Sequence, residues 1–530
     1  MAVNPSIQLG TSGNWAIKED NLLAYKQLGN KFFDREFDFS RGTRATFVGR
    51  NGLIQESGLT SAELVTNGDF SSDTAWVKEN GSTISVGVGN VIANGGINST
   101  AGNWSLNQVD IFAFNKTYKV SFKARQTSGT GNFQVGQAYQ IGFNESITSA
   151  FVEYSFYITA IFFSGNGFKL SIGGATIGDT FEIDNVSVKE IQLDVPRIDF
   201  TDDPTGHLLL EPQSTNLETQ SAALTTGWNL TTGATSQIET SITPFGVSGN
   251  VYKLTNATSN PPSWGASNTL KKQYSVNATD PASFYTFSVY VKSAGSTTIN
   301  IQLRDNTNGQ DLKTGLISLS SEWQRVTISK QLSTSTTLVG IVIAGTDGDI
   351  LLADAQFEQQ SYATSYIPTS GSAVTRNQEL CNNSGTVNDF NSEEGVLYAE
   401  ITALANDGTF RVLGFSDGTQ NNRVFIGYSS VNNIICQFEI SSSVVYNFNF
   451  TADITINSKL ALKYKENDFA LWVNGVEVNS QSSGNTFPIG TLTQMQFTSA
   501  TLSSPFYGKT KNLKVFKRAL TDTELQELTT

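Results

Sequence analysis

Four landmarks occur twice in the same order along the chain, and this repeat constrains the fold more than any other sequence feature. Each copy opens on a polar segment followed by a tryptophan, continues with an alternating strand and then an aromatic strand, and closes on an apolar strand that ends in aspartate. Because the order is kept while the loops differ in length, we expect an internal duplication. The landmarks are 67–70 with Trp76, 118–125, 151–156 and 181–184 in the first copy, and 216–218 with Trp228, 285–292, 323–328 and 351–354 in the second.

The composition indicates short strands joined by many turns. The 530 residues include 46 Gly, 34 Phe and 16 Tyr, and only 15% are charged. Aromatic and β-branched side chains suit a pleated surface, while Gly and Asn tolerate turn dihedrals. In the stretch 118–125, Tyr118, Val120 and Phe122 face one way and the basic residues face the other, as in a half-buried strand. A chain of this length exceeds one hydrophobic core, so we expect several β-sandwiches.

The last part of the chain predicts two consecutive β-hairpins. The stretches 460–464, 469–473 and 476–478 are strand-like, and Asn474 and Gly475 separate the last two. Asn-Gly is a strong hairpin signal because both residues accept a positive φ.

One helix start is also predicted near the end of the chain. Thr521 is the expected N-cap, with Glu524 three residues later in a capping box. Leu520 and Leu525 occupy the positions of a hydrophobic staple. We therefore expect one short helix on an otherwise all-β domain.

The stretch 351–376 divides the chain, because an apolar run is followed there by a tail rich in Ser, Thr, Pro and Gly. We interpret this tail as an extended connector. Near the N-terminus, Arg41, Arg44 and Arg50 favour either a salt-bridged strand surface or a docking peptide. The expected organisation is an N-terminal anchoring segment 1–62, a first module 63–192, a linker 193–215, a second module 216–368, a linker 369–392 and a third domain 393–530.

Charge and residue counts exclude several classes of function. A net charge of −13 argues against binding nucleic acid through phosphates. No apolar run is long enough to cross a bilayer, and the N-terminus shows no secretory leader. With His207 as the single histidine, histidine triads and two-histidine metal sites are excluded. Cys381 and Cys436 are expected to be free thiols.

Three stretches resemble structural proteins of tailed bacteriophages. They are FDFSRGTRAT at 37–46 with NGLI at 51–54, LLLEPQSTNL at 208–217, and SYATSYIPT at 361–369. The resemblance implies a virion surface protein of the tail-fibre or head-fibre type, made in the cytoplasm of the bacterial host. It also implies that the N-terminal segment contacts other virion proteins, and by analogy with phage fibres we expect a homotrimer.

The two repeated modules resemble carbohydrate-binding jelly-roll domains of galactose-binding-like fold. This resemblance implies a structural calcium ion between the opening loop and the last strand, held by Asn67, Asp69 and Asp184 in the first copy and by Glu218 and Asp354 in the second. Oxygen ligands of this kind suit calcium. The alternative for Asp184 is a β-bulge in which its side chain bonds the local backbone.

The third domain resembles a concanavalin-A-like, laminin-G-like sandwich. The residues that carry this resemblance are 471–475 and the stretch from 512 to Leu525. The fold class expected for the whole chain is therefore all-β, with two jelly-roll modules and one concanavalin-A-like sandwich.

Two tryptophans lie outside the strand alternation, in loops rich in Gly, Asn and Pro. An exposed indole there is a platform for the apolar face of a sugar, so Trp104 and Trp264 are the predicted ligand-binding residues. The alternative is that each ring folds back over its own sandwich. The tryptophans at module landmarks are expected in the cores: Trp76, Trp228, Trp323 and Trp472.

These features predict a non-enzymatic virion surface protein that binds host-surface glycans. One alternative is a fibre or capsid decoration protein that contacts only its virion neighbours. The other is a glycan-cleaving hydrolase that uses two carboxylates, whose spacing no sequence reveals.

Overall fold

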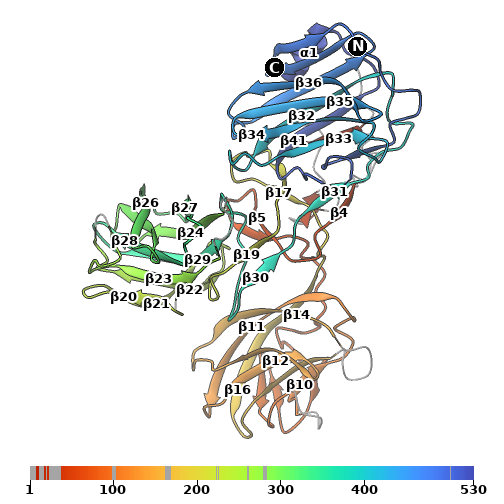
Figure 1. The fold of residues 1–530 in the computed structure, drawn as a ribbon. Helices are drawn as coiled ribbons and strands as arrows, with labels where there is room; N and C mark the ends of the chain where they lie inside the picture. Colours follow the sequence, from red (N-terminus) through yellow and green to blue (C-terminus); the bar gives the residue numbers. More distant parts are fainter. Residues whose placement is uncertain are drawn as a thin grey trace. The chain divides into compact units, whose positions relative to one another are not determined.

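The computed structural model describes residues 37–97, 103–161, 169–222, 224, 226–259, 262–277, 283–501 and 503–530, with the strand backbones at 7–10, 17–18 and 21–22. These residues form paired antiparallel sheets and one short helix, which confirms the all-β fold of tandem sandwiches (Figure 1). The chain divides into two compact units, one of residues 57–193 and one of residues 1–56 with 194–530. No helix in the described part is long and apolar enough to span a membrane.

The unit 57–193 is one β-sandwich. Its two sheets have the orders β14-β11-β16-β9-β8 and β13-β12-β15-β10-β7. Tyr118, Val120 and Phe122 in the strand 117–128 are buried in the core, as their alternation predicts. The strands are β7 (Val77–Lys78), β8 (Thr83–Ser85), β9 (Val88–Ile92), β10 (Leu106–Gln108), β11 (Thr117–Ser128), β12 (Phe133–Gln137), β13 (Gln140–Glu145), β14 (Val152–Thr159), β15 (Leu170–Gly174) and β16 (Thr180–Ile191).

The second module repeats this topology strand for strand. Its sheets have the orders β27-β24-β29-β22-β21 and β26-β25-β28-β23-β20, so each strand has one counterpart in the first module. The duplication inferred from four landmarks therefore extends to the whole sandwich. The strands are β20 (Asn229–Leu230), β21 (Thr235–Ile242), β22 (Ser248–Thr255), β23 (Leu270–Ser275), β24 (Phe284–Ser293), β25 (Thr298–Asp305), β26 (Gln310–Ser318), β27 (Gln324–Gln331), β28 (Leu338–Gly345) and β29 (Ile350–Glu358).

A β-bulge present in both modules shows which residues of the two copies are equivalent. In β16 the bulged residue is Asn185 with φ 52°, and in β29 it is Asp354 with φ 54°. The expected alignment of Asp184 with Asp354 is therefore wrong by one residue, and Asn185 is the counterpart of Asp354. The two aspartates were matched by residue type, and residue type alone does not fix the strand register, whereas the shared bulge does.

The third sandwich packs an eight-stranded sheet on a five-stranded one. The first has the order β17-β18-β41-β32-β37-β38-β39, with β1 (Ile7–Gly10) also paired to β41, and the second has the order β36-β35-β34-β33-β40. The strands are β17 (Arg197–Asp199), β18 (His207–Leu210), β32 (Glu394–Ala403), β33 (Arg411–Ser416), β34 (Arg423–Ser430), β35 (Asn433–Ile440), β36 (Ser443–Thr451), β37 (Ser458–Lys465), β38 (Phe469–Val473), β39 (Val476–Gln481), β40 (Gln494–Gln496) and β41 (Gly508–Phe516).

The local predictions for this sandwich are confirmed. Strands β37, β38 and β39 form two hairpins, and Asn474 and Gly475 both have positive φ. Helix α1 (Asp522–Thr529) starts at a capping box: the Thr521 side chain accepts from the Glu524 amide, and the Glu524 carboxylate accepts from the Thr521 amide at 2.9 Å.

The segments expected to be linkers are built into sheets. The stretch 193–215 supplies β17 and β18, and β19 (Ser214–Asn216) pairs with β30 (Val374–Arg376). Near the N-terminus, β4 (Asp38–Ser40) pairs with β31 (Leu380–Asn382), β5 (Thr46–Val48) pairs with β6 (Ile54–Glu56), and β2 (Ile17–Lys18) pairs with β3 (Asn21–Leu22). The pairs β19–β30 and β4–β31 join residues far apart in sequence, so composition alone does not indicate them.

Five charged side chains form a buried ion network in this unit. Glu379 Oε1 accepts from Arg41 Nη1 and Arg197 Nε, each at 2.9 Å. Glu211 Oε2 accepts from Arg197 Nη2 at 2.9 Å and from Arg376 Nη1 at 2.5 Å. Burial acts to raise the pKa of Glu211, but Arg376 and Arg197 hold it at about 2. All five side chains are at most 3% exposed.

The ion network joins the three stretches that resemble phage proteins. Arg41 lies in the first stretch and Glu211 in the second, while Ser365 of the third donates to Glu211 and accepts from Arg197. The amide of Ser365 also donates to Glu211 Oε1 at 2.8 Å. The tail expected to be an extended connector is therefore held by buried hydrogen bonds.

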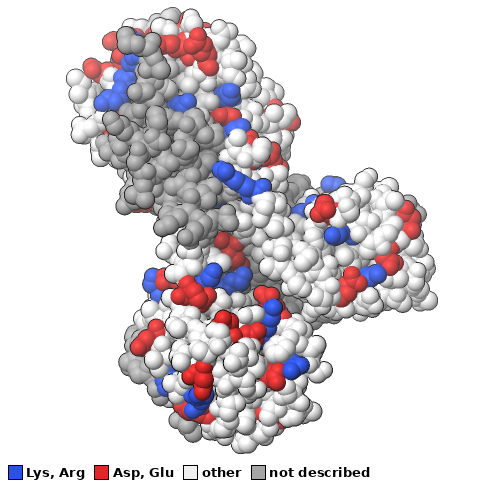
Figure 2. Space-filling view, turned by 180° about the vertical axis from the view of Figure 1, so that it is seen from behind, with Lys and Arg blue, Asp and Glu red and all other residues white. Residues whose placement is uncertain are grey.

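The surface carries charges of both signs. Figure 2 shows basic and acidic side chains interspersed on the visible face, where uncharged residues dominate the described surface. The exclusion of phosphate-backbone binding rests on the net charge of −13 and stays a prediction.

Candidate ligand pocket of the second module

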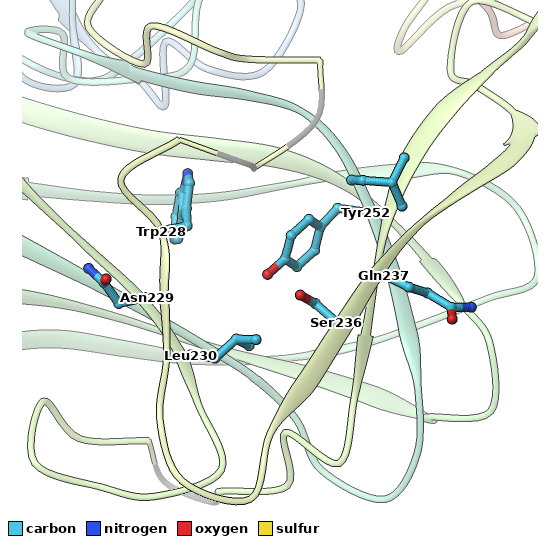
Figure 3. Close-up of a pocket in the computed structure, with 7 residues that line it drawn as sticks. Trp228, Asn229, Leu230, Ser236, Gln237 and Tyr252 are labelled. Carbon is cyan, nitrogen blue, oxygen red and sulfur yellow. The ribbon is translucent and has the colours of Figure 1, made fainter. Parts of the chain in front are cut away.

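The second module has an open pocket of about 390 Å³ between β20 and the strands β21 and β22 (Figure 3). Strand β20 is at the edge of one sheet and β21 at the edge of the other, so the pocket lies at an open edge of the sandwich. A volume of a few hundred Å³ is typical of small-molecule sites. The lining residues are Trp228, Asn229, Leu230, Ser236, Gln237, Ile238 and Tyr252.

The indole of Trp228 is hydrogen-bonded to Glu218, which forms a buried ion pair with Lys272. Its Nε1 donates to Glu218 Oε2 at 3.0 Å, and the hydroxyl of Tyr274 donates to the same oxygen at 2.7 Å. Lys272 Nζ donates to both Glu218 oxygens at 2.7 and 2.8 Å. Because the indole N–H is bonded to this buried and ion-paired carboxylate, Trp228 presents one fixed edge to the pocket.

The opposite wall combines apolar and hydroxyl groups. Figure 3 shows the phenol of Tyr252 and the side chain of Ser236 turned toward the space beside Leu230. Burial raises the pKa of the Tyr252 phenol, so this group stays neutral and able to donate a hydrogen bond at neutral pH. Leu230 and Ile238 are 39% and 42% exposed, so apolar surface is accessible at the pocket mouth.

None of the seven lining residues carries a charge at neutral pH. The lining offers aromatic and aliphatic surface with two hydroxyls, while the side-chain amides of Asn229 and Gln237 are turned away from the space between Trp228 and Tyr252 (Figure 3). Such a lining suits a neutral ligand that has both apolar faces and hydroxyl groups. It lacks the carboxylate pair that glycoside hydrolysis requires.

The proposed calcium ligands of the first module bond their own neighbours. The Asn67 amide donates to Ser72 O at 2.7 Å, and the exposed Asp69 accepts from the Ser71 amide at 3.2 Å. Asp184 Oδ1 accepts from the Asn185 amide at 2.7 Å, within the bulge. This is the local bonding that the alternative interpretation of Asp184 predicts. Among the described residues no group of three or more His, Cys, Asp or Glu is placed to hold a metal ion.

The corresponding residues of the second module have different partners. Glu218 is engaged by Lys272, Trp228 and Tyr274, as described above. Asp354 is buried near Tyr366, and burial raises its pKa to about 7 against smaller lowering effects of Tyr366 and Arg325. The calcium site therefore stays a prediction.

Neither of the two predicted sugar platforms lines this pocket. Trp104 is 4% exposed, donates from Nε1 to Glu79 at 3.0 Å and packs edge-on against Tyr139, so its ring is folded back over its own sandwich. Trp264 is half-buried, and its ring covers Gly340, where an added Cβ would lie 2.7 Å from Cζ3.

The sequence did not indicate the pocket itself. Trp228 was expected in the core, and its ring does pack against Phe287 with centroids 5.9 Å apart. Its other edge forms the pocket wall, because Tyr252 and the edge strand β21 leave space beside it. The alternation of Ser236, Gln237 and Ile238 was the available signal, but it indicates a strand and not an open edge.

No protein-family model and no curated protein matches the chain. Among solved structures, the Ruminococcus gnavus IT-sialidase CBM40 bound to alpha2,3 sialyllactose is 16% identical with a TM-score of 0.25, and the match covers 28% of this chain and 94% of that one. The CBM22-1–CBM22-2 tandem of Paenibacillus barcinonensis Xyn10C is 11% identical with a TM-score of 0.20, covering 56% and 98%. TM-scores this low assign no function to this chain.

Proposed function

We propose that the protein is a non-enzymatic glycan-binding protein and that the pocket of the second module is its binding site. The observation that carries this proposal is an uncharged lining in which an indole edge, a phenol and aliphatic groups stand beside a serine hydroxyl. Sugar rings present C–H faces and hydroxyl edges, which these groups contact and hydrogen-bond. A glycan-cleaving hydrolase is less well supported, because no lining residue is a carboxylate.

The proposed setting is the surface of a phage virion made in the bacterial cytoplasm, with glycans of the host surface as ligands. Its support is the resemblance of the stretches 37–46, 208–217 and 361–369 to phage structural proteins, strengthened by their meeting in one ion network. Contacts of the N-terminal segment with other virion proteins and a homotrimeric state belong to this proposal. Arg41 is already used inside the protein, so such contacts would use other residues of the segment.

The alternative of a purely structural virion protein makes a different prediction about the pocket. A sandwich that contacts only its virion neighbours does not need an open, uncharged pocket with exposed Leu230 and Ile238. Arrayed copies of a weak sugar site reach useful avidity, since linked sites raise overall affinity without new contacts.

A matched pair of substitutions on one strand tests the proposal. Ile238 and Ile242 both lie on β21 and are 42% and 55% exposed, but only Ile238 lines the pocket. In glycan-array and titration measurements on the full chain, we expect Ile238→Glu to weaken binding at least tenfold and Ile242→Glu to leave it unchanged. Absence of glycan binding by the wild-type chain, or equal losses in both variants, would contradict the proposal.

A further inference from the structure

The two modules can be aligned at the pocket through their sheet registers. In the first module Gly89 of β9 pairs with Ile183, and in the second Tyr252 of β22 pairs with Leu352. Ile183 and Leu352 occupy equivalent places relative to the bulge, since each is two residues before the bulged position. Gly89 therefore stands where the second module has Tyr252.

The pocket tryptophans are equivalent as well. Trp76 immediately precedes β7, and Trp228 immediately precedes the counterpart strand β20. Two residues later, Lys78 pairs with Leu106 and Leu230 pairs with Leu270. Lys78 thus takes the place of the pocket residue Leu230.

A phenylalanine fills this place in the first module. The Phe70 ring stacks on Trp76 with centroids 5.1 Å apart and an interplanar angle of 26°, and Phe70 is 0% exposed. A Cβ added to Gly89 would lie 2.9 Å from Phe70 Cε1 and 2.9 Å from Leu106 Cδ1. Real Cβ atoms rarely come so close, so a tyrosine at this position is incompatible with the ring.

We propose that Phe70 and Gly89 close in the first module the site that Trp228 and Tyr252 keep open in the second. This inference rests on the proposed function. Each chain then binds one glycan at this site, and the copy that binds is the one with tyrosine, at Tyr252, and not the one with glycine, at Gly89. The first copy then serves as a structural sandwich.

The mouth of the closed site supports the same conclusion. Lys78 donates to Asp73 at 2.5 Å, so a surface ion pair lies where the second module exposes the aliphatic Leu230. Covering the charged ends of an ion pair with a sugar ring removes their water at a cost in free energy, whereas a leucine offers apolar surface to the ring.

The test uses isothermal titration of the full chain with a glycan identified on the array, and the matched variants Leu230→Asp and Lys78→Asp. We expect one glycan per chain, a loss of at least tenfold in affinity for Leu230→Asp, and unchanged affinity and stoichiometry for Lys78→Asp. Both positions are at the surface, so both variants are expected to fold, which circular dichroism checks.

A further variant places a residue of the first module at the equivalent position of the second module. Tyr252→Gly places at this position the glycine that the first copy has at Gly89. We expect the variant to bind the glycan at least tenfold more weakly than the wild type, which should bind one glycan per chain. Two glycans per wild-type chain, or loss of one of two sites in Lys78→Asp, would overturn the inference and leave the proposed function intact. No binding by the wild-type chain would remove both.

Discussion

Arg197 and Glu379 are 182 residues apart in sequence, yet their buried side chains meet through two parallel hydrogen bonds, Nε to Oε1 at 2.9 Å and Nη2 to Oε2. Both side chains have 0% exposure. This bidentate geometry is the strong form of an arginine–carboxylate contact. It joins a strand at the edge of the third sandwich to the segment that precedes β31.

The first prediction concerns removal of this carboxylate. Glu379→Gln removes the carboxylate partner of Arg41 and leaves Arg197 with Glu211 alone in a buried site. Breaking a buried ion pair in this way typically costs about 3–5 kcal/mol. In calorimetry or urea unfolding, the transition of the unit containing residues 194–530 should fall while that of 57–193 stays. As a control, Lys116→Ala removes an exposed ion pair with Glu190 and should change stability little. Equal shifts of both transitions by Glu379→Gln would contradict this account.

The network should also make the protein sensitive to acid. The pKa of Glu211 is lowered from 4.5 to about 2 in the folded state. Its contribution to stability is therefore complete above about pH 4.5 and is lost as the pH falls toward 2. The urea midpoint, measured between pH 6 and 2.5, should fall more steeply for the wild type than for Glu211→Gln. Parallel curves would show that Glu211 does not titrate in this way.

Asp354 should act in the opposite direction. Burial raises its folded-state pKa to about 7, so the folded protein binds a proton that the unfolded chain has lost above about pH 4. This group lowers stability as the pH rises from about 4 to 7, and the effect is constant at higher pH. Asp354→Asn keeps a residue that tolerates the φ of 54° and removes the charge. We expect it to stabilise the protein by roughly 1–3 kcal/mol at pH 8 and to change it little at pH 4.

The hydrogen bond between Trp228 and Glu218 gives a prediction that links stability to binding. Glu218→Gln removes the countercharge of Lys272 and weakens the acceptor of the indole N–H. A cost of about 3 kcal/mol in unfolding free energy is expected for the unit containing the second module. Glycan affinity should also fall, because the indole edge loses its fixed position. Unchanged affinity in a folded Glu218→Gln variant would show that this support is not needed.

The capping box allows a small and local test. Thr521→Ala removes the side-chain acceptor for the Glu524 amide at the start of α1 and should cost about 1 kcal/mol. Thr521→Ser keeps the hydroxyl and should restore most of the loss. Equal stability of the alanine and serine variants would contradict the role of the cap.

Local features of the fold were predictable from the sequence. The alternation of Tyr118, Val120 and Phe122, the turn at Asn474 and the box of Thr521 with Glu524 each depend on neighbours within a few residues. The duplication was also visible, because its landmarks recur in order. These inferences need no knowledge of which distant segments meet.

Long-range features were not predictable. The stretch around Arg197 and the tail around Ser365 are polar and rich in turn residues, so they indicated linkers. Arg197 is instead paired with Glu211 and Glu379, and Ser365 donates hydrogen bonds to Glu211, and these carboxylates lie elsewhere in the sequence. The pocket escaped prediction for the same reason, since its shape depends on Tyr252 in place of the Gly89 of the other copy.

Strand β41 has a consequence for how the protein is made. It is an interior strand of the eight-stranded sheet, and it pairs with β32 on one side and with β18 and β1 on the other. The ribosome therefore produces β1 and β18 long before the strand that completes their hydrogen bonds. The unit 57–193 closes its own sheets and is free to fold as it emerges, whereas the third sandwich must wait for residues 508–516. Nascent chains that stop before this strand should therefore contain one finished sandwich and leave the edges of β1 and β18 without their partner.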